Sequence, residues 1–286
     1  MKNQTLKFIG IFIILFCVSC EANADDKFDI LSKDNLVAWC IVPFDAAKRT
    51  PEQRAAMLSQ LGIKRCAYDW RAEHVPTFEQ EILAYKKGGI EFFAFWSIHE
   101  EAFQLFEKHD LHPQIWYMMP QPISGLSPAD SIKHTVAKMM PVVERTKAAG
   151  CQLGLYNHGG WAGQPENLVA VCNKFHQLGH SHLGIVYNFH HAHDRIEDWP
   201  ATFNKLKPYL LCLNINGMND GAQPKILSLG RGQHETAMLK VVVESDYQGP
   251  IGILDHRNER DAKDSLLENM NGLEAIRTQI KESNQK

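Results

Sequence analysis

Eight short apolar runs, separated by longer amphipathic stretches, are the feature that most limits how this chain can fold. Each run is almost continuously apolar or β-branched, as strands are when a parallel sheet buries them on both faces. We therefore predict eight strands, over residues 36–42, 64–68, 91–96, 114–118, 152–156, 183–187, 210–215 and 251–254.

Helices are predicted between the runs. Thr50-Pro51-Glu52-Gln53 has a capping threonine, a proline in the first helical position and a glutamine two residues later, which is typical of a helix start. Residues 127–130, Ser-Pro-Ala-Asp, repeat this pattern. Apolar residues then recur at helical spacing on one face, as in Leu168, Val171, Cys172 and Phe175 or in Leu266, Met270, Leu273, Ile276 and Ile280.

Eight strand–helix alternations without a break predict an α/β fold, a single (β/α)8 TIM barrel. We expect it to span residues 30–281 of the 286, after an N-terminal signal peptide and before a polar tail at 282–286. An open, doubly wound sheet is the alternative. No GxGxxG motif follows the first run, so nothing supports a dinucleotide-binding version of that sheet.

Residues 1–24 have the order of regions that a secretory signal peptide requires. Two lysines come first, residues 8–18 are almost wholly apolar, and Ala22-Asn23-Ala24 offers small residues at a cleavage site. The apolar run is too short to span a bilayer comfortably, although an uncleaved anchor is an alternative. Ser19-Cys20 also resembles the end of a lipoprotein signal. We expect an exported protein, periplasmic or secreted, or a lipoprotein anchored through Cys20.

The charge of the chain argues against two classes of binding partner. The net charge is −3 and no polybasic stretch occurs, so we expect neither nucleic acid nor an anionic membrane surface as a partner. No membrane span is expected in the mature chain. Its five cysteines are dispersed, as small buried apolar residues are. The sequence does not indicate an oligomeric state.

Polar and aromatic residues gather where the predicted strands end. In a (β/α)8 barrel the active site forms at the carboxyl ends of the strands. The candidates there, in chain order, are Asp69, Trp70, Arg71, Trp96, Asn157, His158, Asn188, His190, His191, Asn214, Asn216 and His256.

Each candidate has a functional interpretation and a plainer one. Trp70 and Trp96 suit stacking on a sugar ring, and Arg71 with Asn157, Asn188, Asn214 and Asn216 would bind hydroxyl groups. His158, His191 and Asp69 are the candidates for proton transfer, since imidazole titrates near neutral pH. The alternatives are packing at the barrel rim for the tryptophans and solvated loops for the histidines.

Four short motifs carry a resemblance to a known family. They are Asn157-His158-Gly159-Gly160, Asn188-Phe189-His190-His191, Leu229-Gly230-Arg231-Gly232 and Gly249-Pro250-Ile251. With them, residues 36–280 resemble the xylose-isomerase-like barrels, a group of sugar isomerases and epimerases. The resemblance implies a divalent metal in the barrel mouth, held by a glutamate at strand five, an aspartate after strand six, a histidine on strand seven and a glutamate on strand eight.

The chain departs from that ligand set at every position. Tyr156, Asn188, Asn214 and Leu254 stand at the four ligand positions, although a one-residue shift would bring Asp255 to the last of them. Mg²⁺ and Mn²⁺ prefer carboxylate oxygen. A set of His158, His191, His190 and His256 would suit Zn²⁺ better. One divalent ion, Zn²⁺ or Mn²⁺, and no metal at all both remain open.

The resemblance implies a carbohydrate-active isomerase or epimerase that moves a proton next to a sugar carbonyl, with a keto-sugar lyase or hydratase as a variant. Its substrate would be a small carbohydrate. The lost carboxylates favour an alternative, a catalytically inactive carbohydrate-binding barrel. Phosphoester cleavage of the endonuclease IV kind lacks the acids and the basic loops it needs.

Overall fold

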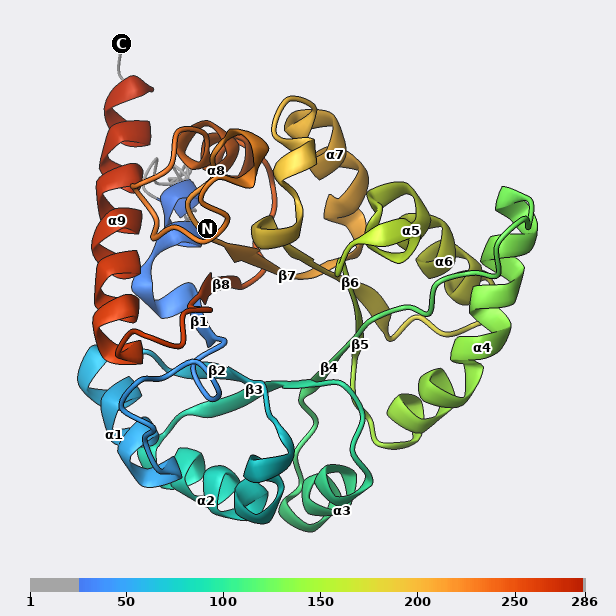
Figure 1. Ribbon diagram of the computed structural model, residues 1–286, viewed down its shortest axis with the longest axis horizontal. Coiled ribbons are helices and arrows are strands. Elements are labelled where there is room, and N and C mark those ends of the chain that lie inside the picture. The colour runs from blue at the N-terminus through green and yellow to red at the C-terminus, as the bar shows by residue number, and fades with distance from the viewer. Residues whose placement is uncertain (1–25, 285–286) are drawn as a thin grey trace, which may run out of the picture.

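The computed structural model describes residues 26–284, which form a closed barrel of eight parallel strands in sequence order (Figure 1). Strand β8 pairs with β1, with Leu36 opposite Ile251, and so closes the ring. The predicted (β/α)8 barrel is confirmed and the open sheet is wrong. The strands are β1 Leu36–Trp39, β2 Arg65–Tyr68, β3 Glu91–Trp96, β4 Gln114–Tyr117, β5 Leu153–Tyr156, β6 Leu183–Asn188, β7 Leu210–Ile215 and β8 Ile251–Leu254.

Helices surround the sheet on its outer face (Figure 1). Both predicted helix starts are present: Gln53 N donates to Thr50 Oγ1 at 3.3 Å, and Asp130 N donates to Ser127 Oγ at 3.1 Å. The α-helices are α1 Pro51–Leu61, α2 Phe78–Gly88, α3 Glu100–His109, α4 Pro128–Ala148, α5 Gly160–Gly163, α6 Pro165–Gln177, α7 Trp199–Leu206, α8 Glu235–Val243 and α9 Ala262–Ser283.

One apolar layer lies between the strands and the helices. The predicted face of α6 is fully buried in it. On α9 the same holds for Leu266, Leu273, Ile276 and Ile280, whereas Met270 is only partly buried. The described cysteines Cys40, Cys66, Cys151, Cys172 and Cys212 are free and buried, as predicted.

A second apolar cluster fills the inside of the barrel, where Val37, Ala67 and Cys212 surround large rings such as Trp39 and Trp116. Glycines inside the strands make room for these rings. A Cβ on Gly154 would lie 2.5 Å from Val186 Cγ2 and 3.2 Å from Trp116 Cδ1, closer than packed atoms tolerate. The barrel is therefore a packed core and not a pore.

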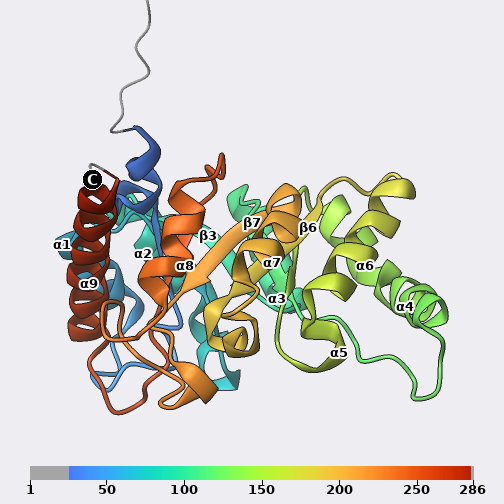
Figure 2. The same cartoon turned by 90° about the horizontal axis from the view of Figure 1, so that it is seen from above.

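The two ends of the barrel are built differently. A 3₁₀ helix, Asp26–Leu31, precedes β1 and packs Phe28, Ile30 and Leu31 against α8 and α9. It lies at the opposite end of the molecule from α5 (Figure 2). The sequence reading did not predict this element. The 3₁₀ helix therefore occupies one end of the barrel. The other end, on the side of α5, remains available for a site.

The predicted signal peptide, including Cys20, lies outside the described residues. Within residues 26–284, none of the helices has the length and apolar character needed to cross a bilayer. Helix α9 continues to Ser283, so the first two residues of the predicted polar tail are helical.

Candidate active site

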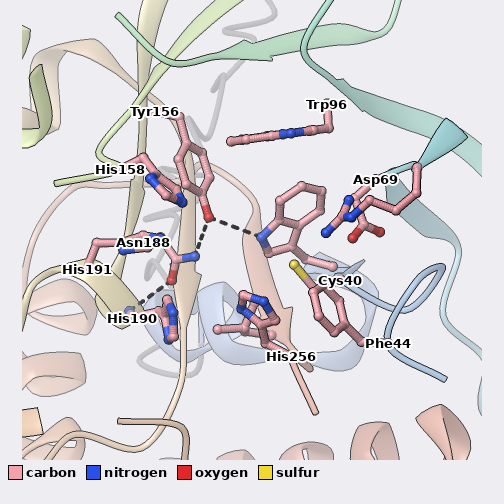
Figure 3. Close-up of a pocket in the computed structure, with 13 residues that line it drawn as sticks. Cys40, Phe44, Asp69, Trp96, Tyr156, His158, Asn188, His190, His191 and His256 are labelled. Atoms are coloured by element: carbon pink, nitrogen blue, oxygen red, sulfur yellow. Dashed lines mark hydrogen bonds between the residues drawn. The ribbon is translucent and has the colours of Figure 1, made fainter. Parts of the chain in front are cut away.

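A cavity of about 210 Å³ opens among the carboxyl ends of the strands (Figure 3). Side chains from β1, β2, β3, β5, β6 and β8, and from the loops that follow them, line it. Of the predicted site residues, the structure brings together Asp69, Arg71, Trp96, His158, Asn188, His190, His191 and His256.

Four histidines form a continuous chain of rings along one side of the cavity (Figure 3). The ring centroids of His158 and His191 lie 4.5 Å apart, those of His191 and His190 also 4.5 Å, and those of His190 and His256 5.1 Å. His256 packs edge-on against Phe44 at 3.9 Å. Residues about 100 positions apart in the chain therefore share one surface.

Burial keeps most of this histidine chain uncharged. Burial, together with Lys225 and the neighbouring histidines, lowers the pKa of His191 to about 2 and that of His190 to about 3. Burial also lowers the pKa of His256. At neutral pH His190 and His191 are therefore neutral imidazoles, which offer one donor and one acceptor each.

Asp69 lies on the side of the cavity opposite the four histidines (Figure 3). It is the acidic side chain among the lining residues. The residue is 2% exposed, and neither carboxylate oxygen has a hydrogen bond of normal geometry among the described residues, although the Val42 backbone N–H and the Cys40 thiol lie close enough to act on it. Burial raises the pKa of Asp69 to about 7, although Arg71 opposes that rise. A carboxyl group with a pKa near neutrality can both accept and release a proton.

A hydrogen-bond network connects the histidine side of the cavity with its aromatic floor. Trp39 Nε1 donates to Tyr156 Oη at 3.3 Å, and Asn188 Nδ2 donates to the same oxygen. Asn188 Oδ1 accepts from the backbone N–H of His190 at 3.0 Å. The dashed lines in Figure 3 show this path. It fixes the positions of Tyr156 and Asn188 on the cavity wall.

Four predicted substrate-binding residues are placed away from the cavity. Asn157 points along the sheet, where it accepts from Asn188 N at 2.7 Å and donates to Asn188 O at 3.0 Å. Trp70 packs on Phe78 and Phe95 and donates to Trp96 O at 2.7 Å. Both therefore support the wall and do not line it.

Asn214 and Asn216 are fully buried. Asn214 Oδ1 accepts from Cys212 Sγ at 3.6 Å, and a Cβ on Gly252 would lie 1.8 Å from that oxygen. Asn214 thus fills space against β8. Asn216 Nδ2 donates to Gly217 O at 2.8 Å, so its amide serves the local loop.

Several lining residues, among them Trp39 and Cys40, were not predicted as site residues. The reason is that β1 was expected to continue to Val42, which placed its end too late. Cys40 adopts a left-handed backbone with φ of 58°, and the strand ends at Trp39. Such a conformation normally indicates glycine or asparagine, so no sequence signal marked the turn. Phe44, Tyr156 and Leu254 complete this group.

The side chains at the ligand positions do not fit the divalent ion that the resemblance implies. Tyr156 Oη already accepts two hydrogen bonds, Asn188 Oδ1 accepts from a backbone N–H, and Leu254 has no donor atom. Asp255 is not among the lining residues and pairs with Arg257 at 3.2 Å. Within residues 26–284 no group of three or more histidine, cysteine or acidic side chains is arranged to hold a metal. The predicted histidine ligand set gains no support from the structure.

No family model matches this sequence, and no curated protein sequence matches it either. Solved structures do match over most of their length. The 3-keto-D-glucoside 4-epimerase YcjR from E. coli is 13% identical, with a TM-score of 0.62, and the match covers 86% of this chain and 100% of that one. The D-psicose 3-epimerase from Clostridium cellulolyticum H10, solved with D-tagatose, is 11% identical (TM-score 0.61, 85% and 98%).

The fold is that of the xylose-isomerase-like barrels. The IolI protein, solved with a zinc atom, also shares it at 10% identity (TM-score 0.67, 86% and 99%). At these identities the likeness is one of barrel architecture.

Proposed function

We propose that this protein is a sugar-modifying enzyme that moves a proton at the carbon next to a ketone. The observation that carries the proposal is Asp69: a buried carboxyl group with no hydrogen bond of normal geometry, which lines a cavity together with neutral histidines and aromatic rings. A structural carboxylate is normally hydrogen-bonded or paired. A catalytic one must keep its oxygens available for the substrate.

The chemistry follows from that placement. The carboxylate of Asp69 takes the C–H proton, the C–H electron pair becomes a carbon–carbon double bond, and the carbonyl oxygen takes up the negative charge. If Asp69 returns the proton to the former carbonyl carbon while the hydroxyl proton moves to the other oxygen, the sugar is isomerised. Epimerisation needs a second group on the opposite side, such as His158 or His191, to protonate the other face while Asp69 keeps the proton that it took. Loss of the hydroxyl group on the next carbon, which leaves as water with the proton held by Asp69, would instead make the reaction a dehydration. His158 and His191 line the opposite side of the cavity, where they would meet the hydroxyl groups of a bound sugar.

The cavity favours a small, uncharged sugar. Its volume of about 210 Å³ is below the ~300–1,000 Å³ of pockets for drug-sized ligands, so it suits a single sugar unit. The indole of Trp96 and the ring of Phe44 offer apolar surface to the C–H face of such a unit. Arg71 is the one arginine or lysine among the lining residues, so a phosphate group would meet a single guanidinium at the cavity wall.

Hydrogen–deuterium exchange tests this function directly. The purified protein is incubated in D₂O with free ketohexoses, including D-psicose, D-tagatose and D-fructose, and with 3-keto-glucosides. Proton NMR then follows the signal of the carbon next to the carbonyl. We expect exchange with the wild-type protein and a loss of about 10²–10⁴-fold with Asp69→Asn.

The alternative, a carbohydrate-binding barrel, predicts a different result. Calorimetry would then show a sugar binding equally well to wild type and Asp69→Asn, and no sugar in the panel would exchange. That outcome would replace the enzyme proposal.

We further propose that the enzyme works outside the cytoplasm. The charged, apolar and small-residue regions of residues 1–24 support this. Mass spectrometry of the protein isolated from its source distinguishes the routes: a chain that begins at Asp25 indicates cleavage, a diacylated Cys20 indicates a lipoprotein, and an intact Met1 contradicts both.

A further inference from the structure

We propose that the hydroxyl group of Tyr156 is a binding site for the substrate's carbonyl oxygen, and that it takes over the carbonyl-polarising role that the resemblance gives to a metal ion. This inference rests on the proposed function and adds to it the group that stabilises the negatively charged oxygen. The ligand class is a ketone that can form an enediolate.

Tyr156 is already engaged in two hydrogen bonds through its hydroxyl oxygen. A phenol oxygen can accept two hydrogen bonds and donate one. Tyr156 Oη accepts from Trp39 Nε1 and from Asn188 Nδ2. An indole N–H and an amide NH₂ are donors only, so neither can accept the hydroxyl proton of Tyr156.

The orientation of the Asn188 amide decides whether that side chain donates to Tyr156 or accepts from it, because its oxygen and nitrogen have nearly the same shape. The neighbouring backbone settles the orientation. The N–H of His190 lies 3.0 Å from Asn188 Oδ1, and a backbone N–H can only donate. The oxygen must therefore face His190, and the NH₂ group must face Tyr156.

The hydroxyl proton of Tyr156 consequently has no acceptor in either of these two partners. No acceptor for it is found among residues 26–284, although Tyr156 is only 3% exposed. Figure 3 shows its oxygen pointing toward the cavity centre, between Asn188 and the indole above Cys40. A buried donor without an acceptor destabilises the folded protein, and a ligand oxygen in the cavity would accept this hydrogen bond.

The surroundings suit a developing negative charge. Two N–H groups directed at the Tyr156 oxygen polarise its O–H bond, as chains of hydrogen bonds do. Burial, the largest effect, raises the pKa of Tyr156 above its usual value, so the group remains a donor at every working pH. Fixed donors in a dry site stabilise an oxyanion without rearranging. Asp69 lines the same cavity and can take the proton from the adjacent carbon.

Two variants test this role in the exchange assay. Tyr156→Phe keeps the ring and removes the hydroxyl group. Asn188→Asp keeps Tyr156 whole but replaces a donor by an acceptor, which draws the hydroxyl proton away from the cavity. We expect kcat to fall about 10²–10³-fold in the first variant and at least about tenfold in the second, while KM changes little because the ground-state ketone is less charged.

Tyr85→Phe is the matched control, because Tyr85 is also buried and also loses one hydrogen bond, to Cys66 Sγ at 3.2 Å. Its kcat should stay within about twofold of wild type. Circular dichroism melting curves confirm that each variant is folded. If Tyr156→Phe does not fold, the Asn188→Asp result decides.

The outcomes separate this inference from the proposed function. Exchange by wild type together with folded variants of unchanged kcat overturns the role of Tyr156 and leaves the enzyme proposal standing. A loss that appears only in KM also overturns it, because it indicates a positioning contact. Absence of exchange by wild type overturns both.

Discussion

At the scale of single residues, two adjacent side chains just after β2 have different roles: one lines the cavity and the other packs outside it. Asp69 lines the cavity, while Trp70, one position later, packs on the helix side against Phe78. The two residues follow directly after β2 and continue its alternation, in which Ala67 belongs to the inner apolar cluster and Tyr68 to the outer one. The sequence shows that both residues lie at the rim, but it does not show which of the two faces inward.

The raised pKa of Asp69 predicts a pH profile for activity. The base form is the carboxylate, so kcat/KM should rise about tenfold per pH unit below about 7 and level off above it. Asp69 faces Arg71, Cys40 and the more distant Arg54. Steady-state rates between pH 5 and 9 check the profile. Rates that fall as the pH rises would show that Asp69 acts in its protonated form instead.

The same pKa predicts a trade-off between stability and function. An unfolded aspartate titrates near ~3.9 and folded Asp69 near about 7, so the folded state binds more protons between these values. Stability is therefore lost as the pH rises through this window, and the penalty is complete above about 7. Asp69→Asn should add on the order of 1–4 kcal/mol at pH 8 and almost nothing at pH 4.

Urea unfolding at the two pH values measures this difference. Asp246→Asn is a suitable control, because Asp246 is exposed beside Lys207 and its pKa is lowered by that contact. It should not stabilise the protein at pH 8. An equal effect of Asp69→Asn at both pH values would contradict the raised pKa.

At the scale of elements, the strands could be predicted because strands buried on both faces are continuously apolar in sequence. Most predicted boundaries lie within one residue of those observed. The first strand ends earlier than predicted because Cys40 leaves the extended conformation. A cysteine in a sequence does not indicate that its backbone will be left-handed. The structural role of Asn157 could not be predicted for another reason. In the sequence, an asparagine that hydrogen-bonds a neighbouring strand looks the same as one that binds a sugar.

Asn157 should be essential for the junction of β5 and β6. Asn157→Ala leaves the backbone N–H and C=O of Asn188 without their buried partners, which should cost about 2–4 kcal/mol of the free energy of unfolding. Asn204→Ala on the exposed face of α7 is the control and should cost no more than about 0.5 kcal/mol. Urea denaturation compares them. A small cost for Asn157→Ala would show that water replaces the amide.

At the scale of the whole molecule, the barrel separates chemistry from support. The cavity lies among the carboxyl ends of the strands, and the 3₁₀ helix Asp26–Leu31 packs at the other end (Figure 2). Barrel enzymes share this division. The inward layers between the two ends are packed, so a change at one end need not reach the other.

Leu31, 2% exposed at the supporting end, tests that separation. Leu31→Ala should lower the free energy of unfolding by about 2–5 kcal/mol and leave kcat of the folded enzyme unchanged. Leu83→Ala, at a side chain 49% exposed, is the matched control and should have almost no effect on either quantity. A fall in kcat for folded Leu31→Ala would mean that the two ends are coupled.

The aromatic floor of the cavity has an optical consequence. The indole of Trp39 lines the cavity and lies 5.8 Å from that of Trp96 and 4.7 Å from that of Trp116, centroid to centroid. Chromophores at this separation couple their electronic transitions. A sugar that settles on Trp39 and Trp96 changes the surroundings of this coupled set, so the near-ultraviolet circular dichroism and the emission of the unlabelled protein report occupancy without any added dye.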